Sequence, residues 1–169
     1  MNNICIIDKS LSNEECDLLI DEFLPKLEGS VRAFWNYSFY DVSFDNKILN
    51  KLTSNIIEIY KNKYPEVNYT HEKWSTQNFK FKVFEPGNYY DSLHSEQSSE
   101  NARILSILVY LSDHNCGTEF HDGTMIKSVK GRSLIFPAFW THAHKGQPCP
   151  DKKRRFILSA YATLDKEIK

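Results

Sequence analysis

The sequence predicts an α+β fold that is mainly β. Two amphipathic helical patterns occupy the amino-terminal third, and roughly eight short strand patterns separated by turn residues follow residue 70. This order is typical of helices that support a β-sandwich or a double-sheet jelly roll. We expect a single domain over residues 1–169, with a helical support over about 1–70 and a β core over about 78–163.

Both helices are predicted from apolar spacing and from signals at their ends. Ser12 and Glu15 have the S-x-x-E form of a capping box, in which each side chain satisfies a backbone donor at the start of a helix. Apolar residues then recur at helical spacing over 16–24 and again over 48–60. The second helix must end before Pro65, because the residue that precedes a proline is disfavoured in the helical conformation.

The strands are predicted from alternation, aromatic content and turn residues. Residues 79–84 alternate apolar and polar side chains and end at a Glu-Pro-Gly-Asn turn, and Asp122-Gly123 is typical of a tight hairpin. We expect strands at 34–44, 79–84, 103–111, 118–121, 125–129, 133–138 and 155–163.

Composition excludes several classes of protein. A formal net charge of -1 provides no overall field that would attract nucleic acid, and no apolar run is long enough to span a membrane. The cysteines, at positions 5, 16, 116 and 149, form no CxxC pair. The sequence therefore predicts neither a zinc knuckle nor a disulfide framework, and it favours a reduced, cytoplasmic setting, which is the host cytoplasm if the chain is viral.

A metal site is suggested by histidines and a carboxylate on either side of the strand region. His94 and Glu96 are one residue apart, so on an extended strand their side chains project to the same face. A second histidine, His142 or His144, follows the strand at 133–138. Two histidines and one carboxylate form the ligand set of non-haem Fe(II) sites that leave coordination positions open.

A series of motifs around these residues resembles the Fe(II)- and 2-oxoglutarate-dependent oxygenases. The motifs lie at residues 84–96, 109–112, 117–120, 131–137, 144–148 and 155–157. They are most similar to the prolyl 4-hydroxylase-like branch, which includes small phage and bacterial members. The resemblance implies a double-stranded β-helix, which is a cupin-like jelly roll, on two supporting amino-terminal helices. It also implies Fe(II), 2-oxoglutarate and O2, with ascorbate as a candidate further cofactor.

The resemblance assigns roles to individual residues. It implies that His94, Glu96 and His144 bind the iron, because the stretch from His144 to Pro148 is similar to the family's distal histidine motif. Arg155 is expected to bind the far carboxylate of 2-oxoglutarate, with the adjacent Arg154 as the alternative, and Tyr90 is expected near that co-substrate. Two positions depart from the family pattern: Glu96 replaces the usual aspartate, and Phe84 stands where relatives often carry tyrosine.

The expected function is that of a dioxygenase. The resemblance implies oxidative decarboxylation of 2-oxoglutarate to succinate and CO2, coupled to hydroxylation of a C–H bond in a peptide, protein or small molecule. A peptidyl proline is the first candidate, and the polar segment 91–102 is a candidate lid that selects the substrate. The alternatives are a non-catalytic, cupin-like metal-binding protein and a structural jelly roll.

Overall fold

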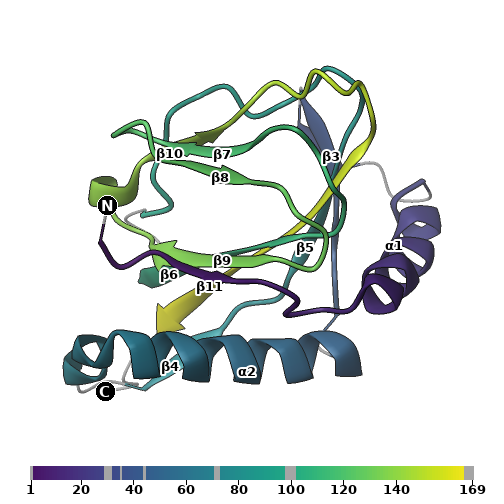
Figure 1. The fold of residues 1–169 in the computed structure, drawn as a ribbon. Coiled ribbons are helices and arrows are strands. Elements are labelled where there is room, and N and C mark those ends of the chain that lie inside the picture. Colours follow the sequence, from purple (N-terminus) through teal and green to yellow (C-terminus); the bar gives the residue numbers. More distant parts are fainter. Residues whose placement is uncertain are drawn as a thin grey trace.

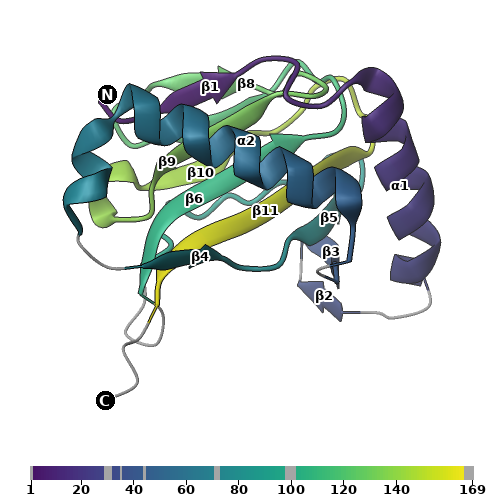
Figure 2. The same ribbon diagram turned by 90° about the horizontal axis from the view of Figure 1, so that it is seen from below.

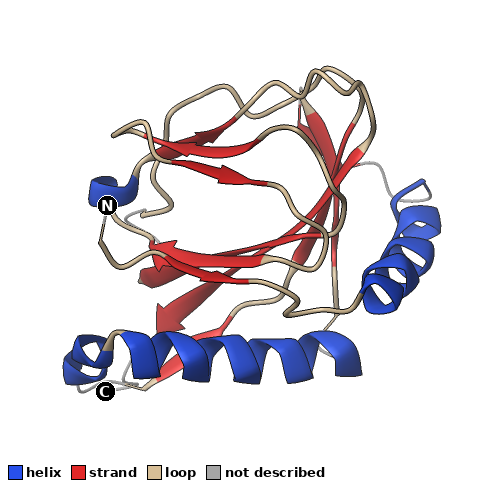
Figure 3. Cartoon of the chain, in the orientation of Figure 1, coloured by secondary structure: helices blue, strands red, loops and turns tan. Residues whose placement is uncertain are grey.

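Two antiparallel sheets lie face to face, and two helices lie outside the larger sheet (Figure 1). The computed structural model describes residues 2–28, 32–34, 36–43, 45–70, 73–97 and 102–165. Residues 35 and 44 of the expected aromatic strand, and 98–101 of the expected lid, lie outside the described residues. The elements observed are mainly strands, which confirms a mainly β, jelly-roll-like fold (Figure 3).

Helix α1 begins at the predicted capping box, and helix α2 begins at an asparagine cap that the sequence analysis does not identify. Helix α1 (Asn13–Glu28) follows the capping box: the backbone N–H of Glu15 donates to Ser12 Oγ at 3.1 Å, and that of Ser12 donates to Glu15 Oε2 at 2.8 Å. Helix α2 (Lys47–Lys63) begins after Asn46, whose side chain accepts from Leu49 N at 3.0 Å. It ends before Pro65, as predicted, and a 3-10 turn η1 (Pro65–Thr70) follows.

The larger sheet contains eight strands among the described residues, and the smaller sheet contains three. The path of the larger sheet is β1 (Cys5–Ile7), β9 (Ser133–Pro137), β6 (Arg103–Tyr110), β11 (Arg155–Leu164), β5 (Lys80–Phe84), β3 (Tyr37–Asp41) and β2 (Arg32–Phe34), and β4 (Trp74–Thr76) also pairs with β11. The order of the smaller sheet is β10 (His144–Gly146), β7 (Gly117–Phe120) and β8 (Met125–Lys127). A short 3-10 helix, η2 (Trp140–His142), precedes β10.

The core is divided by the larger sheet. On its outer side, α2 crosses the strands (Figure 2) and buries Leu52, Ile56 and Tyr60 in one cluster with residues of β5, β6 and β11. On its inner side, a second cluster joins the two sheets through residues such as Phe120 and Phe136. Burying both faces of the larger sheet removes a large apolar area from water, which is the main stabilising contribution to such a fold.

The pairing of β11 with β5 decides which side chains face the space between the sheets. Arg155 is opposite Phe84, and Ile157 is opposite Lys82. Because side chains alternate along a strand, these four residues share the inner face, whereas Leu158 belongs to the cluster on the helix side. In the described part of the chain, no helix is both long and apolar enough to cross a membrane.

Candidate functional site

The segment after β5 is joined to β10 by backbone hydrogen bonds that bring two histidines together. The N–H of His94 donates to the carbonyl of His144 at 3.0 Å, and the N–H of His144 donates to the carbonyl of His94 at 2.9 Å. The N–H of Gly146 likewise donates to the carbonyl of Tyr90 at 2.7 Å. The imidazole centroids of His94 and His144 lie 4.5 Å apart, so residues about fifty positions apart in sequence form one site.

Glu96 completes a cluster of three potential metal ligands. Its Oε1 atom lies 3.3 Å from His94 Nε2 and 3.7 Å from His144 Nε2. One ligand atom from each of the three residues lies within 4.8 Å of the others. Two imidazole nitrogens and one carboxylate oxygen in this arrangement leave room for a metal ion bound by all three and for additional ligands.

The other ring nitrogens of the two histidines fix which nitrogen faces the carboxylate. His94 Nδ1 lies 2.9 Å from the carbonyl oxygen of Ser92, and His144 Nδ1 lies 3.1 Å from that of His142. A carbonyl oxygen only accepts, so in each ring Nδ1 carries the proton. In each ring the Nε2 atom therefore faces the Glu96 carboxylate, and this close approach is stable only if a proton or a cation lies between the two atoms. This donor set fits Fe(II).

The second oxygen of Glu96 is held by two residues of the larger sheet. Tyr161 donates its phenol hydrogen to Glu96 Oε2 at 2.9 Å, and Arg103 Nη1 lies 3.6 Å from the same oxygen. Arg103 also donates to the Glu96 carbonyl oxygen at 3.2 Å and stacks on the Tyr161 ring at 3.8 Å. These contacts leave Oε1 facing the histidines. They constrain the glutamate, which is one methylene longer than the aspartate that the resemblance leads one to expect.

The charge state of the cluster follows from its surroundings. Burial opposes ionisation of Glu96, but the hydrogen bond with His94 and the charge of Lys82 outweigh it and hold the pKa of the carboxyl at about 2. Burial lowers the pKa of His144 to about 4. Burial also raises the pKa of Tyr161 far above its usual range, so the phenol stays protonated. Near neutral pH the site therefore contains a carboxylate and a neutral His144.

The structure separates the two candidates for the distal histidine. His142 is buried in η2, and its Nε2 lies 2.8 Å from the carbonyl oxygen of Asn2, away from Glu96. Its contribution to the cluster is its own backbone carbonyl, which accepts from His144 Nδ1. His144, not His142, is therefore the histidine that the fold brings to His94 and Glu96.

Arg155 projects into the same pocket from the start of β11. It is 2% exposed, its guanidinium carbon lies 4.6 Å from the centroid of the Phe84 ring, and Nη1 donates to the carbonyl oxygen of Gln147 at 3.4 Å. Among the described residues, no carboxylate lies within ion-pair distance of Arg155, and its buried Nε has no hydrogen-bond partner. Burial lowers the pKa of Arg155, yet a guanidinium remains charged at any physiological pH. An anionic ligand would complete its contacts.

Arg154 lies on the opposite face of the strand and is already paired. Its Nη2 lies 3.0 Å from Glu85 Oε1, and its Nε donates to Glu85 Oε2 at 3.1 Å, in an exposed ion pair. The fold thus places Arg155 in the pocket and Arg154 outside it.

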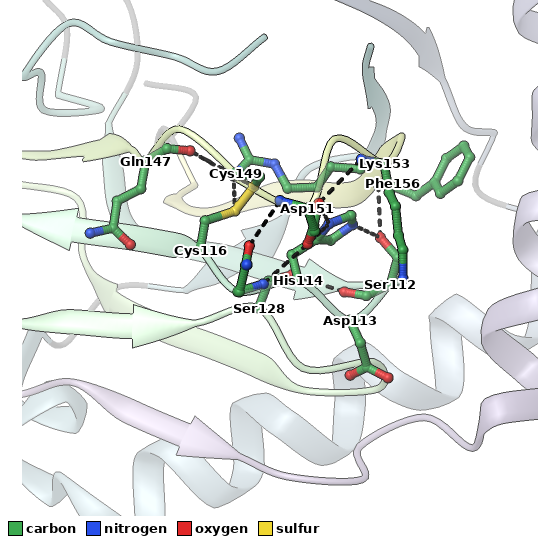
Figure 4. A network of polar contacts seen from close by, with 12 residues as sticks. Ser112, Asp113, His114, Cys116, Ser128, Gln147, Cys149, Asp151, Lys153 and Phe156 are labelled. Carbon is green, nitrogen blue, oxygen red and sulfur yellow. Dashed lines mark hydrogen bonds and ion pairs between the residues drawn. A yellow bond between two sulfur atoms is a disulfide. The ribbon is translucent and has the colours of Figure 1, made fainter. Parts of the chain in front are cut away.

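The expectation that the cysteines form no disulfide is wrong. Cys116 and Cys149 are joined, with Cα atoms 4.9 Å apart (Figure 4). Both sulfurs accept from Arg155 Nη1, at 3.3 and 3.5 Å. Beside the bridge, His114 is buried and lies 3.0 Å from Asp151 Oδ2. The disulfide therefore forms part of the surface that the Arg155 guanidinium contacts. Cys5 and Cys16 are unpaired and buried.

These groups line one pocket between the sheets. Its empty volume is about 710 Å3, a figure that includes open solvent at its mouth. Tyr90 lines it as well, with its ring centroid 4.4 Å from that of His94. Gly146 fits closely between Tyr90 and Arg155, because an added Cβ would lie 3.1 Å from Tyr90 N and 3.3 Å from Arg155 Nη2.

Three residues of the site are not identified by sequence reasoning: Lys82, Arg103 and Tyr161. Lys82 lines the pocket from β5; burial lowers its pKa, and the Glu96 carboxylate acts in the opposite direction. Arg103 and Tyr161 meet only because β6 pairs with β11. The available signal for Lys82 was its spacing from Phe84, since residues two positions apart on a strand share a face.

Comparisons by sequence find no relative. No family model matches the chain, and no curated protein is significantly similar to it in sequence.

Comparisons by structure find prolyl hydroxylases. A viral collagen prolyl hydroxylase from Paramecium Bursaria Chlorella virus-1, in complex with 2-oxoglutarate, matches with a TM-score of 0.76 and 21% identity, over 98% of this chain and 97% of that one. A Pseudomonas putida prolyl-4-hydroxylase matches with a TM-score of 0.76 and 12% identity, over 97% and 94%.

A third match is a Trichoplax adhaerens prolyl hydroxylase in complex with a peptide fragment of the hypoxia inducible factor oxygen degradation domain. Its TM-score is 0.75 and its identity is 13%, over 96% of this chain and 84% of that one. The likeness that the motifs predict is therefore confirmed at the level of the fold: this chain has the fold of the prolyl hydroxylases.

Proposed function

We propose that the protein is an Fe(II)- and 2-oxoglutarate-dependent dioxygenase that hydroxylates a C–H bond. The observation that carries the proposal is the direction of the two Nε2 atoms toward the Glu96 carboxylate, since in each ring the Nδ1 atom is held by a backbone carbonyl oxygen. His94, Glu96 and His144 would bind the iron. We further propose that the two sheets form a double-stranded β-helix and that residues 1–169 are one domain.

Arg155 would bind the distal carboxylate of 2-oxoglutarate. It offers a buried guanidinium that has no protein carboxylate in the described residues, and a bidentate pair with a carboxylate is the geometry that guanidinium favours. The Phe84 ring contacts one face of the guanidinium in a cation–π interaction, which does not require the hydroxyl of the tyrosine that relatives often carry. Tyr90 would close the pocket beside His94.

The chemistry divides between the metal and the chain. When bound, Fe(II) supplies O2 activation coupled to decarboxylation of 2-oxoglutarate to succinate and CO2, with ascorbate as a candidate reductant. Tyr161 and Arg103 hold Oε2 of Glu96, so the carboxylate presents Oε1 in a fixed direction. The backbone carbonyls of Ser92 and His142 orient the imidazoles. The apolar residues between the sheets limit access of water to the site.

A peptidyl proline is the first substrate to test. The structural neighbours are named as prolyl hydroxylases, and one of them contains a bound peptide. A protein side chain, a free amino acid or another small molecule remain further candidates of the same reaction type.

Succinate release tests the proposal. Anaerobically prepared protein with Fe(II) and 2-oxoglutarate should form succinate when O2 is admitted, and proline-containing peptides should increase the yield. Metal binding without 2-oxoglutarate consumption would indicate a non-catalytic metal-binding protein. Failure to bind metal would indicate a structural jelly roll, and either result would contradict the proposal.

A further inference from the structure

Lys82 places a cation in the pocket where the predicted chemistry does not require one. It lies on β5 opposite Ile157, and its Nζ lies 5.1 Å from the centroid of the Tyr37 ring. It lines the same pocket as Arg155, on the same face of the sheet. On the paired strands β5 and β11, the pair Lys82–Ile157 lies two residues from the pair Phe84–Arg155. The backbone positions of Lys82 and Arg155 are therefore about 7 Å apart in the direction of the strands.

Among the described residues, Lys82 differs from the lysines around it in having no carboxylate at ion-pair distance. In the described part of the chain, no carboxylate lies within 4.0 Å of its ammonium group, and no acceptor lies within hydrogen-bond distance. Lys80, two residues earlier, pairs with Asp41 at 2.7 Å, and Lys145 lies 3.5 Å from Glu119. Lys82 is half-buried, so its ammonium group loses part of its hydration without gaining an ion pair, and an anion bound in the pocket would offset that cost.

Lys82 and Arg155 lie in different surroundings. Lys82 lies opposite Ile157, with its Nζ atom beside the Tyr37 ring. The guanidinium of Arg155 instead lies against the Phe84 ring and the Cys116–Cys149 bridge. One pocket therefore offers two separate positions for anions, and 2-oxoglutarate bound by Arg155 and the metal would use one of them.

We propose that Lys82 binds a carboxylate of the substrate that is oxidised, next to the ring of Tyr37. The inference rests on the proposed function, because it takes the Arg155 position as filled by 2-oxoglutarate. The carboxylate belongs either to a small molecule, such as an N-blocked amino acid, or to an acidic residue beside the target residue of a peptide. The chemistry that Lys82 recognises is the same in both cases.

Matched acids and amides test the inference by direct binding. The first pair is N-acetyl-L-proline and N-acetyl-L-prolinamide, and the second is acetyl-Ala-Pro-Glu-amide and acetyl-Ala-Pro-Gln-amide. Each is titrated calorimetrically into anaerobic protein loaded with Fe(II) and 2-oxoglutarate, in which no turnover occurs. In at least one pair, the acid should bind about tenfold more tightly than its amide, as expected for one charge-assisted contact. The pair that shows the preference identifies the source of the carboxylate.

Three variants assign the preference to one side chain. Lys82→Met should abolish it, Lys82→Arg should retain part of it, and Lys80→Met should leave it unchanged, because Lys80 is on the same strand and already paired. The inference is overturned if wild type prefers neither acid or if the preference survives Lys82→Met. It is also overturned if Lys82→Met weakens 2-oxoglutarate binding as much as Arg155→Met does. Succinate release by the wild type tests the proposed function independently of the role of Lys82.

Discussion

Replacing Arg155 by methionine should weaken 2-oxoglutarate binding about a hundredfold. The side chain is 2% exposed, so water provides little compensation for the lost contact. A hydrogen bond to a charged group contributes about 1.5–3 kcal/mol, so a two-bond guanidinium–carboxylate pair supports a loss of about 3 kcal/mol, which is about a hundredfold in Kd. Methionine keeps an unbranched apolar side chain against the Phe84 ring, which limits the accompanying change in packing.

The assay is calorimetric titration of 2-oxoglutarate into anaerobic Fe(II)-loaded protein, with the Tm of each variant measured as a check of folding. Arg155→Lys keeps the charge but not the planar fork, so its loss should be smaller, about tenfold. Arg154→Met is the matched control, since that residue is exposed and paired with Glu85. A large loss with Arg154→Met and none with Arg155→Met would refute the reasoning.

Three further predictions concern the surroundings of the metal ligands. Tyr161→Phe removes the donor to Glu96 Oε2 and should lower Fe(II) affinity about tenfold in a competition titration, whereas an unchanged affinity would show that Tyr161 does not orient the carboxylate. Cys149→Ser opens the loop closed with Cys116, which spans 33 positions, and should lower the free energy of unfolding by about 4 kcal/mol in urea; equal stability would contradict a bridge in solution. In metal-free protein, the pKa of His144 is lowered from 6.5 to about 4, so the unfolded state binds more protons between these pH values. Stability should therefore fall on the order of 3 kcal/mol as pH decreases from 6.5 to 4, and His144→Gln should remove most of that slope.

The sequence predicts the elements of the fold that depend on local signals. The capping box at Ser12 and Glu15 forms α1 as expected, and Pro65 limits α2 as expected. The alternation at 79–84 predicts β5, because a period of two is a property of the strand itself. The ordered motifs also lead to the prolyl hydroxylase fold, although no sequence comparison finds a relative.

Features that depend on pairing between distant strands are not predicted. Alternation identifies which residues share a face of β5, but it does not say what each face contacts. The sequence therefore does not predict that Lys82 lines the pocket between the sheets. Cys116 and Cys149 meet through the path of the chain around Arg155, so their spacing in sequence gives no indication of a bridge. The contact of Arg103 with Tyr161 requires the register of β6 against β11.

Anaerobic titration of Fe(II) into wild type and three histidine variants tests the central claim most directly. Wild type should bind a single Fe(II), His94→Ala and His144→Ala should lose that binding, and His142→Ala should retain it, because the His142 side chain contacts Asn2 instead of the cluster. Adding 2-oxoglutarate should then perturb the visible absorption of the bound iron in wild type and in His142→Ala. Retention of Fe(II) by His144→Ala together with its loss in His142→Ala would contradict the assigned site, as would the absence of stoichiometric binding in wild type.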